Sequence, residues 1–364
     1  MEEKDFIYDA LTIEQLEKLS VTAPDEQIRT AAKEHWDAIA KPLDGLGVFE
    51  QLIADIAAIQ GRVRPKISRR VLLILCADHG IVEEGVSQCG SHVTRLVAEN
   101  MGKELSSVGR MAKRSGVDTC PVDLGILGRE RIEGVLDRKI REGSRNFIKE
   151  PALTGKEVLV AIQTGIRLVW EKKMQGYDML ALGEMGIGNT TSSAAVCAAL
   201  LGLEASEVTS RGAGLSDEGL DRKIAVIQKA VEKYDLGNRS AFEVLCDVGG
   251  LEIAGLCGVC IAGALYRMPV VLDGVITMTA ALAAERLCPG VREYLLASHI
   301  GKEKACGLLA KALDLKPVID AGMKLGEGTG AVMLFPLLDM TEAVYENGGS
   351  FDELTIRPYE RYGK

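Results

Sequence analysis

The chain is 364 residues long, carries a net charge of −9 and is 47% hydrophobic, with aromatic residues at only 4%. This length fits one large domain with an appendage, or two domains. The acidic balance argues against a nucleic-acid-binding protein, although scattered lysines and arginines leave small anionic ligands possible. With 40 glycines and few aromatic rings, small and aliphatic side chains must fill the core, which is typical of α/β proteins.

The cysteine usage and the hydropathy predict a cytoplasmic protein without a membrane segment. Nine cysteines lie mostly in apolar or alanine-rich runs, which indicates reduced thiols that pack as small hydrophobes. The N-terminal sequence shows no secretory signal pattern, and no apolar run is long enough to cross a bilayer. Cys257 and Cys260 have the spacing of half a metal motif, but no second pair exists, so no metal is expected.

The two ends of the chain share a polar, helical pattern. Near the N-terminus, Thr12 stands three residues before Gln15, which predicts a capping box at the start of a helix. The C-terminal part is again helical and then polar. We therefore predict a small helical subdomain made of residues 1–45 and 337–364, and a large catalytic domain made of residues 46–336.

Between these ends, short apolar runs alternate with helical stretches. The run at residues 71–77 is continuously apolar, as expected of a strand that is buried on both faces. Further strands are predicted at residues 117–122, 179–182, 242–245, 269–272 and 295–297. Helices are predicted between them, at residues 91–115, 155–175 and 190–202. This alternation predicts an α/β fold with a Rossmann-like, doubly wound parallel sheet, in which ligands bind at the carboxyl ends of the strands.

One carboxylate is notable because three glycines surround it. Glu327 lies in the sequence Leu-Gly-Glu-Gly-Thr-Gly at residues 325–330. Glycine permits positive φ and the close approach of a ligand, so Glu327 is a candidate general base. From this stretch alone, a tight turn with a solvated glutamate is the alternative interpretation.

A second glycine-rich segment, residues 183–191, follows a predicted strand and opens a helix. Free N–H groups at such a helix start bind anions, and Asn189, Thr190 and Thr191 add side-chain donors. The segment lacks both the Walker ending and the dinucleotide fingerprint, so a monophosphate fits better than a diphosphate. Lys223, on a later predicted helix, could reach the phosphate as a point charge. An ordinary capped helix and a solvated lysine are the alternatives.

Asp78 and His79 follow the first apolar run. A zinc site is not expected there, because the four histidines of the chain share no ligand spacing. A serine hydrolase is not expected either, because the sequence has no nucleophile elbow. We interpret the two side chains as groups that orient loops or polar ligand atoms.

Together these stretches resemble the nicotinate-nucleotide–dimethylbenzimidazole phosphoribosyltransferase family, which activates the lower ligand of cobamides. The matching stretches occur in family order, at residues 77–80 with 84–86, and at 141–146, 183–191, 247–250, 269–274, 298–299 and 325–330. The resemblance implies a Rossmann-like domain, a small helical domain from both chain ends, and a dimer. It also implies transfer of the 5-phosphoribosyl group of nicotinate mononucleotide to an aromatic base, without a cofactor.

The resemblance assigns Glu327 as the general base that removes a proton from the incoming base. The ribosyl centre gains oxocarbenium character during transfer, which a nearby carboxylate such as Glu184 could stabilise. The residues expected at the phosphate and nucleotide are Gly186, Gly188, Asn189, Thr190, Thr191, Lys223, Gly249 and Gly250. The residues expected at the acceptor base are Asp78, His79, Cys89, Val97, Met185 and Leu325.

The acceptor side departs from the family pattern. Many relatives carry a glutamine where Val97 stands, and a serine where Gly301 stands; the loop around Cys89 and residues 103–108 also differ. We therefore expect that dimethylbenzimidazole is not the preferred acceptor; a phenol, adenine or another base of the benzimidazole type are the candidates. The partner subunit is expected to be a second copy or a paralogue.

Two alternatives are left open by the sequence. A non-catalytic paralogue could bind the nucleotide and support a catalytic partner, although such a protein has no reason to retain Glu327. A nicotinamide-dependent oxidoreductase is the weaker alternative, because the dinucleotide fingerprint is missing.

Overall fold

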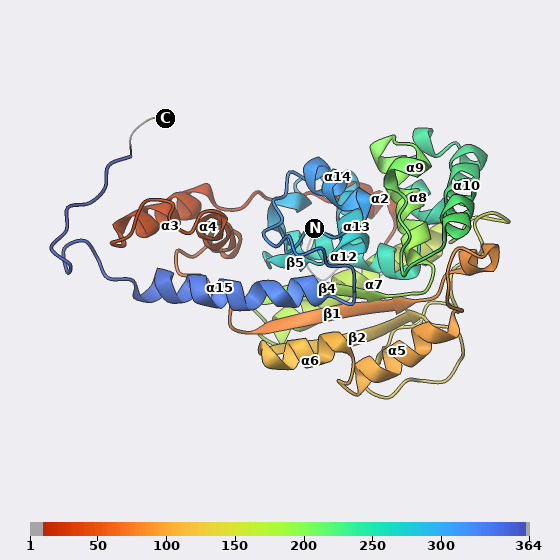
Figure 1. Cartoon of the computed structure of the whole chain (residues 1–364), viewed down its shortest axis with the longest axis horizontal. Helices are drawn as coiled ribbons and strands as arrows, with labels where there is room; N and C mark the ends of the chain where they lie inside the picture. The colour runs from red at the N-terminus through yellow and green to blue at the C-terminus, as the bar shows by residue number, and fades with distance from the viewer. Residues whose placement is uncertain (1–9, 362–364) are drawn as a thin grey trace.

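The computed structural model describes residues 10–361, in which one six-stranded parallel sheet has the strand order β3-β2-β1-β4-β5-β6 (Figure 1). The strands are β1 (Arg70–Ala77), β2 (Val117–Gly125), β3 (Leu136–Asp137), β4 (Met179–Met185), β5 (Val270–Leu272) and β6 (Leu295–Ala297). This is the doubly wound order, with a topological switch point between β1 and β4. The predicted α/β, Rossmann-like fold is confirmed.

The sheet is buried on both faces because its strands are mainly apolar. All eight residues of β1 are buried. Leu73 and Leu75 enter the core on one face, and Leu72 and Ile74 enter the core on the other. Each such side chain stabilises the fold by about 1.5–3 kcal/mol when it is removed from water.

Helices cover each face and contribute to the two cores. The first core includes residues of α2 (Ile13–Glu17), α7 (Gly155–Met174), α8 (Asn189–Leu201), α9 (Ala205–Val208), α10 (Asp217–Tyr234), α11 (Ala241–Val248), α12 (Leu251–Leu265), α13 (Val275–Leu287) and α14 (Lys304–Ala312). The second includes residues of α3 (Glu26–Ala38), α4 (Val48–Gln60), α5 (His92–Gly102), α6 (Ser107–Arg114) and α15 (Thr329–Asn347). Three short 3₁₀ helices complete the described elements, at η1 (Gly80–Glu84), η2 (Leu236–Asn238) and η3 (Val291–Tyr294). No helix between residues 10 and 361 is long and apolar enough to span a membrane.

A projection formed by α3, α4 and the second half of α15 extends away from the sheet (Figure 1). Trp36 of α3 packs against Tyr345 of α15 with 4.7 Å between ring centroids, and Ile39 pairs with Ser350 in an antiparallel bridge. Segments from the two ends of the chain therefore meet here. The predicted boundary between residues 336 and 337 falls inside α15, which continues past Pro336 as one helix. The division into two domains stays a prediction.

Local capping explains where several helices begin. The predicted capping box is present in α2, where Thr12 and Gln15 bond to each other's backbone N–H groups. The same device corrects one predicted strand: residues 242–245 belong to helix α11. Ser240 and Glu243 form a capping box there, and the buried residues recur with helical spacing, at Ala241, Val244, Leu245 and Val248. A four-residue apolar run does not by itself separate a strand from a buried helix.

The single helix predicted at residues 91–115 is two helices, α5 and α6. Glu104 between them has φ of 56°, a left-handed conformation that a right-handed helix cannot contain. Ser106 then caps α6 by accepting the N–H of Gly109. The two-residue strand β3 was not predicted, because so short an element leaves no periodic pattern.

Candidate active site

A cavity of about 260 Å³ lies at the carboxyl ends of β4, β5 and β6. Its wall includes side chains that follow three neighbouring strands: Glu184 in β4, Asp273 after β5 and His299 after β6. Glu327 and Thr190 also line it. Ligands bind at this edge of doubly wound sheets, so the cavity is the candidate active site.

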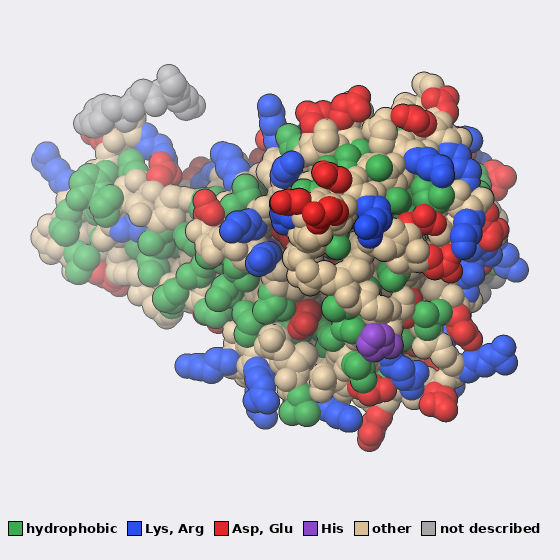
Figure 2. Space-filling view, turned by 45° about the vertical axis from the view of Figure 1, so that its right-hand side comes forward, with side chains coloured by type: hydrophobic (Ala, Val, Ile, Leu, Met, Phe, Trp, Pro, Cys, Tyr) green, Lys and Arg blue, Asp and Glu red, His purple; other side chains and the backbone are tan. Residues whose placement is uncertain are grey.

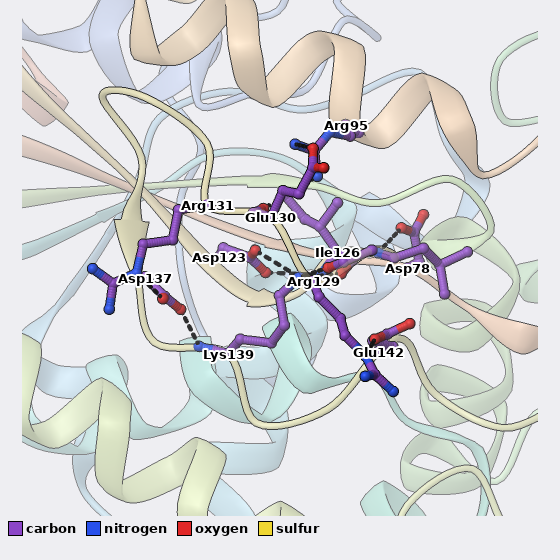
Figure 3. A network of polar contacts seen from close by, with 12 residues as sticks. Asp78, Arg95, Asp123, Ile126, Arg129, Glu130, Arg131, Asp137, Lys139 and Glu142 are labelled. Atoms are coloured by element: carbon purple, nitrogen blue, oxygen red, sulfur yellow. Dashed lines mark hydrogen bonds and ion pairs between the residues drawn. The ribbon is translucent and has the colours of Figure 1, made fainter.

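Larger hollows occur around β3, the outer strand on the other side of the sheet from β6. One of about 490 Å³ is lined by several charged side chains. These side chains pair with one another (Figure 3): Lys139 lies 3.2 Å from Asp123, Arg131 lies 3.0 Å from Asp137, and Arg129 lies 3.4 Å from Glu142. Because each of these cations already has a carboxylate partner, the hollow offers little uncompensated charge to a substrate.

The turn that carries Glu327 is left-handed at three successive residues. Gly326, Glu327 and Gly328 have φ values of 80°, 63° and 92°. A non-glycine residue in this region costs about 1–2 kcal/mol, so the surrounding structure must hold Glu327 there. Gly183 of β4 lies directly against it, because a Cβ on Gly183 would clash with the carbonyl oxygen of Glu327.

Asp273 holds this turn in place. Its carboxylate accepts the backbone N–H groups of Gly328, Gly330 and Ala331 at 3.2, 2.7 and 3.3 Å. These groups form the N-terminal end of α15, where a negative charge is stabilising. Burial raises the pKa of Asp273, and the nearby His299 and the three N–H groups oppose that rise. The sheet thus fixes the Glu327 turn through one carboxylate.

The Glu327 carboxyl group is arranged to accept a proton. Its Oε2 atom is buried and has no hydrogen-bond partner among residues 10–361. Burial, with a further contribution from the charge of Asp273, raises the pKa of Glu327 above its usual value. A carboxylate with a raised pKa and a free oxygen is a stronger base than a solvated one.

Glu184 lies between the Glu327 turn and the start of α8. A Cβ on Gly326 would lie 2.9 Å from Oε1 of Glu184, and the side-chain amide of Asn189 donates to Oε2. Burial and the charges of Asp273 and Glu252 raise the pKa of Glu184 to about 8. At neutral pH this group is mostly protonated, so it can donate a hydrogen bond. The role expected from the sequence, stabilisation of a positively charged ribosyl centre, needs the ionised form instead.

A buried lysine lies at the other end of the cavity. Lys223 of α10 is 1% exposed, and its Nζ donates to the hydroxyl of Thr190 at 2.8 Å. The solvated-lysine interpretation is therefore wrong. Burial lowers the pKa of Lys223 to about 8, against the opposing charge of Glu303. Since no carboxylate lies within ion-pair distance of Lys223 among the described residues, an anion bound beside Thr190 would stabilise its charge.

Comparison with known proteins identifies the family. A sequence profile described as "Phosphoribosyltransferase" matches residues 21–356. The chain is 41% identical over 324 residues to a nicotinate-nucleotide–dimethylbenzimidazole phosphoribosyltransferase of Acetivibrio thermocellus, covering 89% of this chain and 92% of that protein. It is 36% identical over 350 residues to the protein of the same name from Clostridium acetobutylicum, covering 96% and 99%.

The chain belongs to the nicotinate-nucleotide–dimethylbenzimidazole phosphoribosyltransferase family. Its fold agrees with that assignment, because it superposes on the crystal structure of CobT from Thermus thermophilus with a TM-score of 0.86 and 35% identity. That match covers 91% of this chain and 99% of the other. The resemblance inferred from the sequence motifs is confirmed.

Most of the residues that the family resemblance singled out lie around the cavity, but not all. Its wall contains these members of the expected set: Glu184, Glu327, Gly186, Asn189, Thr190, Val97, Met185 and Leu325. Gly188 lines a smaller hollow of about 70 Å³ that shares Thr190 with the main cavity. Lys223 reaches the site through Thr190.

The remaining expected residues do not line the cavity, and their predicted roles stay predictions. Asp78 accepts the N–H of Leu127 at 2.8 Å, and His79 is enclosed by buried side chains, so both lie behind the cavity wall. The other expected residues that do not line the cavity are Cys89, Thr191, Gly249 and Gly250. Strand ends carry side chains both into the cavity and away from it, and sequence position alone does not separate the two.

Asp273 was missing from the predicted site. Like Glu184, Asp273 is an acidic residue at the end of an apolar run. His299 likewise closely follows β6 and lines the cavity. If every Asp, Glu or His at the end of a predicted strand had been taken as a site candidate, both residues would have been found.

Proposed function

We propose that this protein transfers the 5-phosphoribosyl group of nicotinate mononucleotide to an aromatic base, giving an α-ribotide and nicotinate for cobamide synthesis. The observation that carries the proposal is one continuous series of contacts along the cavity. It runs from Lys223 through Thr190 and Asn189 to Glu184, and then to the Glu327 turn. The cationic Lys223 and the proposed base Glu327 therefore lie at the two ends of this series of contacts.

The chemistry follows from these positions. The phosphate binds beside Thr190 and Lys223, where the start of α8 and a lysine favour an anion. The C1′–N bond to nicotinate breaks, and a bond from C1′ to the acceptor forms on the opposite face. Glu327 takes the proton that the acceptor releases. Glu184, mostly protonated at neutral pH, donates a hydrogen bond to the ribose. Holding both rings against one ribose supplies much of the rate.

The acceptor end is apolar. Val97, Met185 and Leu325 line it, and Val97 stands where the family resemblance predicts a glutamine. These three side chains cannot donate or accept hydrogen bonds, so at this end Glu327 is left as a polar partner for a ring nitrogen of the acceptor. We therefore propose a preferred acceptor other than dimethylbenzimidazole. An apolar wall fits a phenol better than adenine, which has more polar groups; a phenol, with pKa near 10, would need Glu327 as its base.

The test is a competition assay. The protein is incubated with nicotinate mononucleotide and equal amounts of dimethylbenzimidazole, adenine and a simple phenol, and the α-ribotides are separated by chromatography. We expect nicotinate release with each accepted base and a preference for a base other than dimethylbenzimidazole. Clear preference for dimethylbenzimidazole would refute the acceptor proposal alone, and no release with any base would refute the transfer itself.

We also propose that the protein works as a dimer, of two copies or of this chain with a paralogue. Figure 2 shows apolar side chains gathered on the projection. Exposed apolar residues include Met340 in α15, and Leu354 and Ile356 in the segment that follows it. A second subunit would remove them from water. Light scattering of the purified chain, alone and mixed with a paralogue, tests this. All nine cysteines are free thiols, which supports a cytoplasmic location.

A non-catalytic paralogue is the alternative function. It is not favoured, because Glu327 is present in a strained turn that Asp273 holds in place. A protein that only binds nucleotide would gain nothing from that strain.

A further inference from the structure

Three buried polar side chains lie behind the phosphate end of the cavity and take no part in the reaction proposed above. Nδ1 of His79 lies 2.9 Å from the hydroxyl oxygen of Ser192 on α8, and Nε2 lies 2.7 Å from Oε1 of Glu252 on α12. All three side chains are buried. A carboxylate accepts hydrogen bonds, so Nε2 donates. The imidazole is therefore held in one orientation by a partner at each nitrogen.

Three glycines make room for this imidazole. A Cβ on Gly250 would clash with Cε1 of His79, and a Cβ on Gly188 would lie 3.0 Å from the Cβ of His79. A Cβ on Gly186 would lie 3.3 Å from Nε2 of His79. The sequence predicts that these glycines approach the nucleotide. Their contacts show that they also enclose His79, which therefore packs against the inner side of the nucleotide loop.

Ser192 connects the imidazole to the side chains that face the cavity. It follows Asn189 by three residues on α8, which is close to one helical turn. The Asn189 amide donates to Glu184, and the Thr190 hydroxyl accepts from Lys223. Any rotation or shift of this turn moves both contacts together. The bond between His79 and Ser192 restrains that movement from the inner side of the helix.

The order Ser–His–Glu is also that of a hydrolase triad. Burial excludes that chemistry here, because Ser192 is 0% exposed and does not line the cavity. No substrate carbonyl can reach its hydroxyl. The three side chains can act only on the geometry of the elements that carry them.

We propose that His79, oriented by Glu252, is a positioning residue for the nucleotide site. Through Ser192 it holds the first turn of α8, and thereby sets the places of Asn189 and Thr190. The proposal rests on the phosphoribosyl transfer proposed above.

Adjacent serines on α8 provide a matched test. Ser193 is 1% exposed, and its hydroxyl has no hydrogen-bond partner among the described residues. Ser192→Ala and Ser193→Ala therefore remove the same group from neighbouring buried sites, but only the first loses a bond to His79. We expect Ser192→Ala to raise KM for nicotinate mononucleotide about three- to tenfold, as for the loss of one buried hydrogen bond. The KM for the acceptor base should stay unchanged, and Ser193→Ala should leave both values unchanged.

A second variant acts on the other partner of the imidazole. Glu252→Gln keeps the shape of the side chain and removes its charge, and we expect the same selective rise in KM. Ser192 and Glu252 both act through His79. The double variant should therefore raise KM by less than the product of the two single effects.

The proposal is overturned if Ser192→Ala and Ser193→Ala have equal KM values, or if the effects of Ser192→Ala and Glu252→Gln multiply. A lower melting temperature for Ser192→Ala with unchanged KM would assign it a purely structural role, which also overturns the proposal. If the wild-type protein releases no nicotinate, the proposed transfer reaction is refuted, but the positioning role is not. Calorimetric binding of nicotinate mononucleotide to the same variants then decides whether the positioning role holds.

Discussion

At the phosphate end of the cavity, Lys223 is 1% exposed and hydrogen-bonds to Thr190, whereas at the acceptor end Leu325 is 53% exposed and apolar. The first end is built from side chains that other side chains already hold in place. The second end is a set of apolar side chains, open to solvent on one side. A site that is preorganised for one substrate and loosely specified for the other can accept a different second substrate without a change at the first.

The largest expected effect is at Glu327, the proposed general base. Glu327→Gln removes the proton acceptor but keeps the shape of the turn, so kcat should fall by about 10²–10⁴. Binding of nicotinate mononucleotide, measured by calorimetry, should be retained. Asp320→Asn is the control, because Asp320 is an exposed carboxylate in the segment before the same turn. Full activity of Glu327→Gln would remove Glu327 from its role.

The next effect tests the phosphate end alone. Lys223→Met keeps an apolar stem and removes the charge, which should raise KM for nicotinate mononucleotide by about 10–100-fold, as for a charged hydrogen bond. Lys229→Met is the matched control, since Lys229 lies on the same helix and is less buried. An equal loss in both variants would indicate a general effect on charge. If the KM for the acceptor base rises instead, Lys223 acts at the acceptor end of the cavity and its proposed contact with the phosphate is wrong.

A pH profile tests the group between the two ends. The pKa of Glu184 is raised to about 8, so the form that donates a hydrogen bond is lost as the pH rises through that value. We expect kcat to fall above about pH 8, by up to tenfold per pH unit. Lys223 loses its charge over the same range, but its loss should appear in KM for the nucleotide. In Glu184→Gln the alkaline fall in kcat should disappear; if it persists, another group titrates.

The smallest effect tests the acceptor end. Val97→Gln introduces the glutamine that the family resemblance predicts at this position, and adds a donor and an acceptor to the apolar wall. The ratio of kcat/KM for dimethylbenzimidazole over a phenol should rise about five- to tenfold, the value of one hydrogen bond. Val97→Leu controls for size. An unchanged ratio in Val97→Gln would show that other residues choose the base.

Together these changes separate the two ends. Effects confined to the nucleotide at Lys223, and to the acceptor at Val97, would confirm that the site divides into two independent halves. Mixed effects would mean that the Glu327 turn transmits changes from one half to the other, through the contacts that Asp273 and Glu184 make with it.

Much of this protein follows from its sequence because the relevant signals are local. An apolar run such as that of β1 can only be a fully buried strand or part of a buried helix, and the polar residues that follow it mark the carboxyl end of the sheet. The glycines beside Glu327 indicated a turn with positive φ, since backbone sterics allow few other uses for them. The strand end at Glu184 and the start of α8 could be identified because glycines follow an apolar run there as well.

Tertiary structure alone decided which of these groups are buried and which touch. Lys223 is an ordinary helix lysine by its neighbours in sequence, yet burial beside Thr190 gives it a pKa of about 8. His79 meets Ser192 and Glu252 across 113 and 173 residues. Burial, electrostatic coupling and hydrogen-bond partners depend on residues that are distant in the chain, so no local pattern contains them.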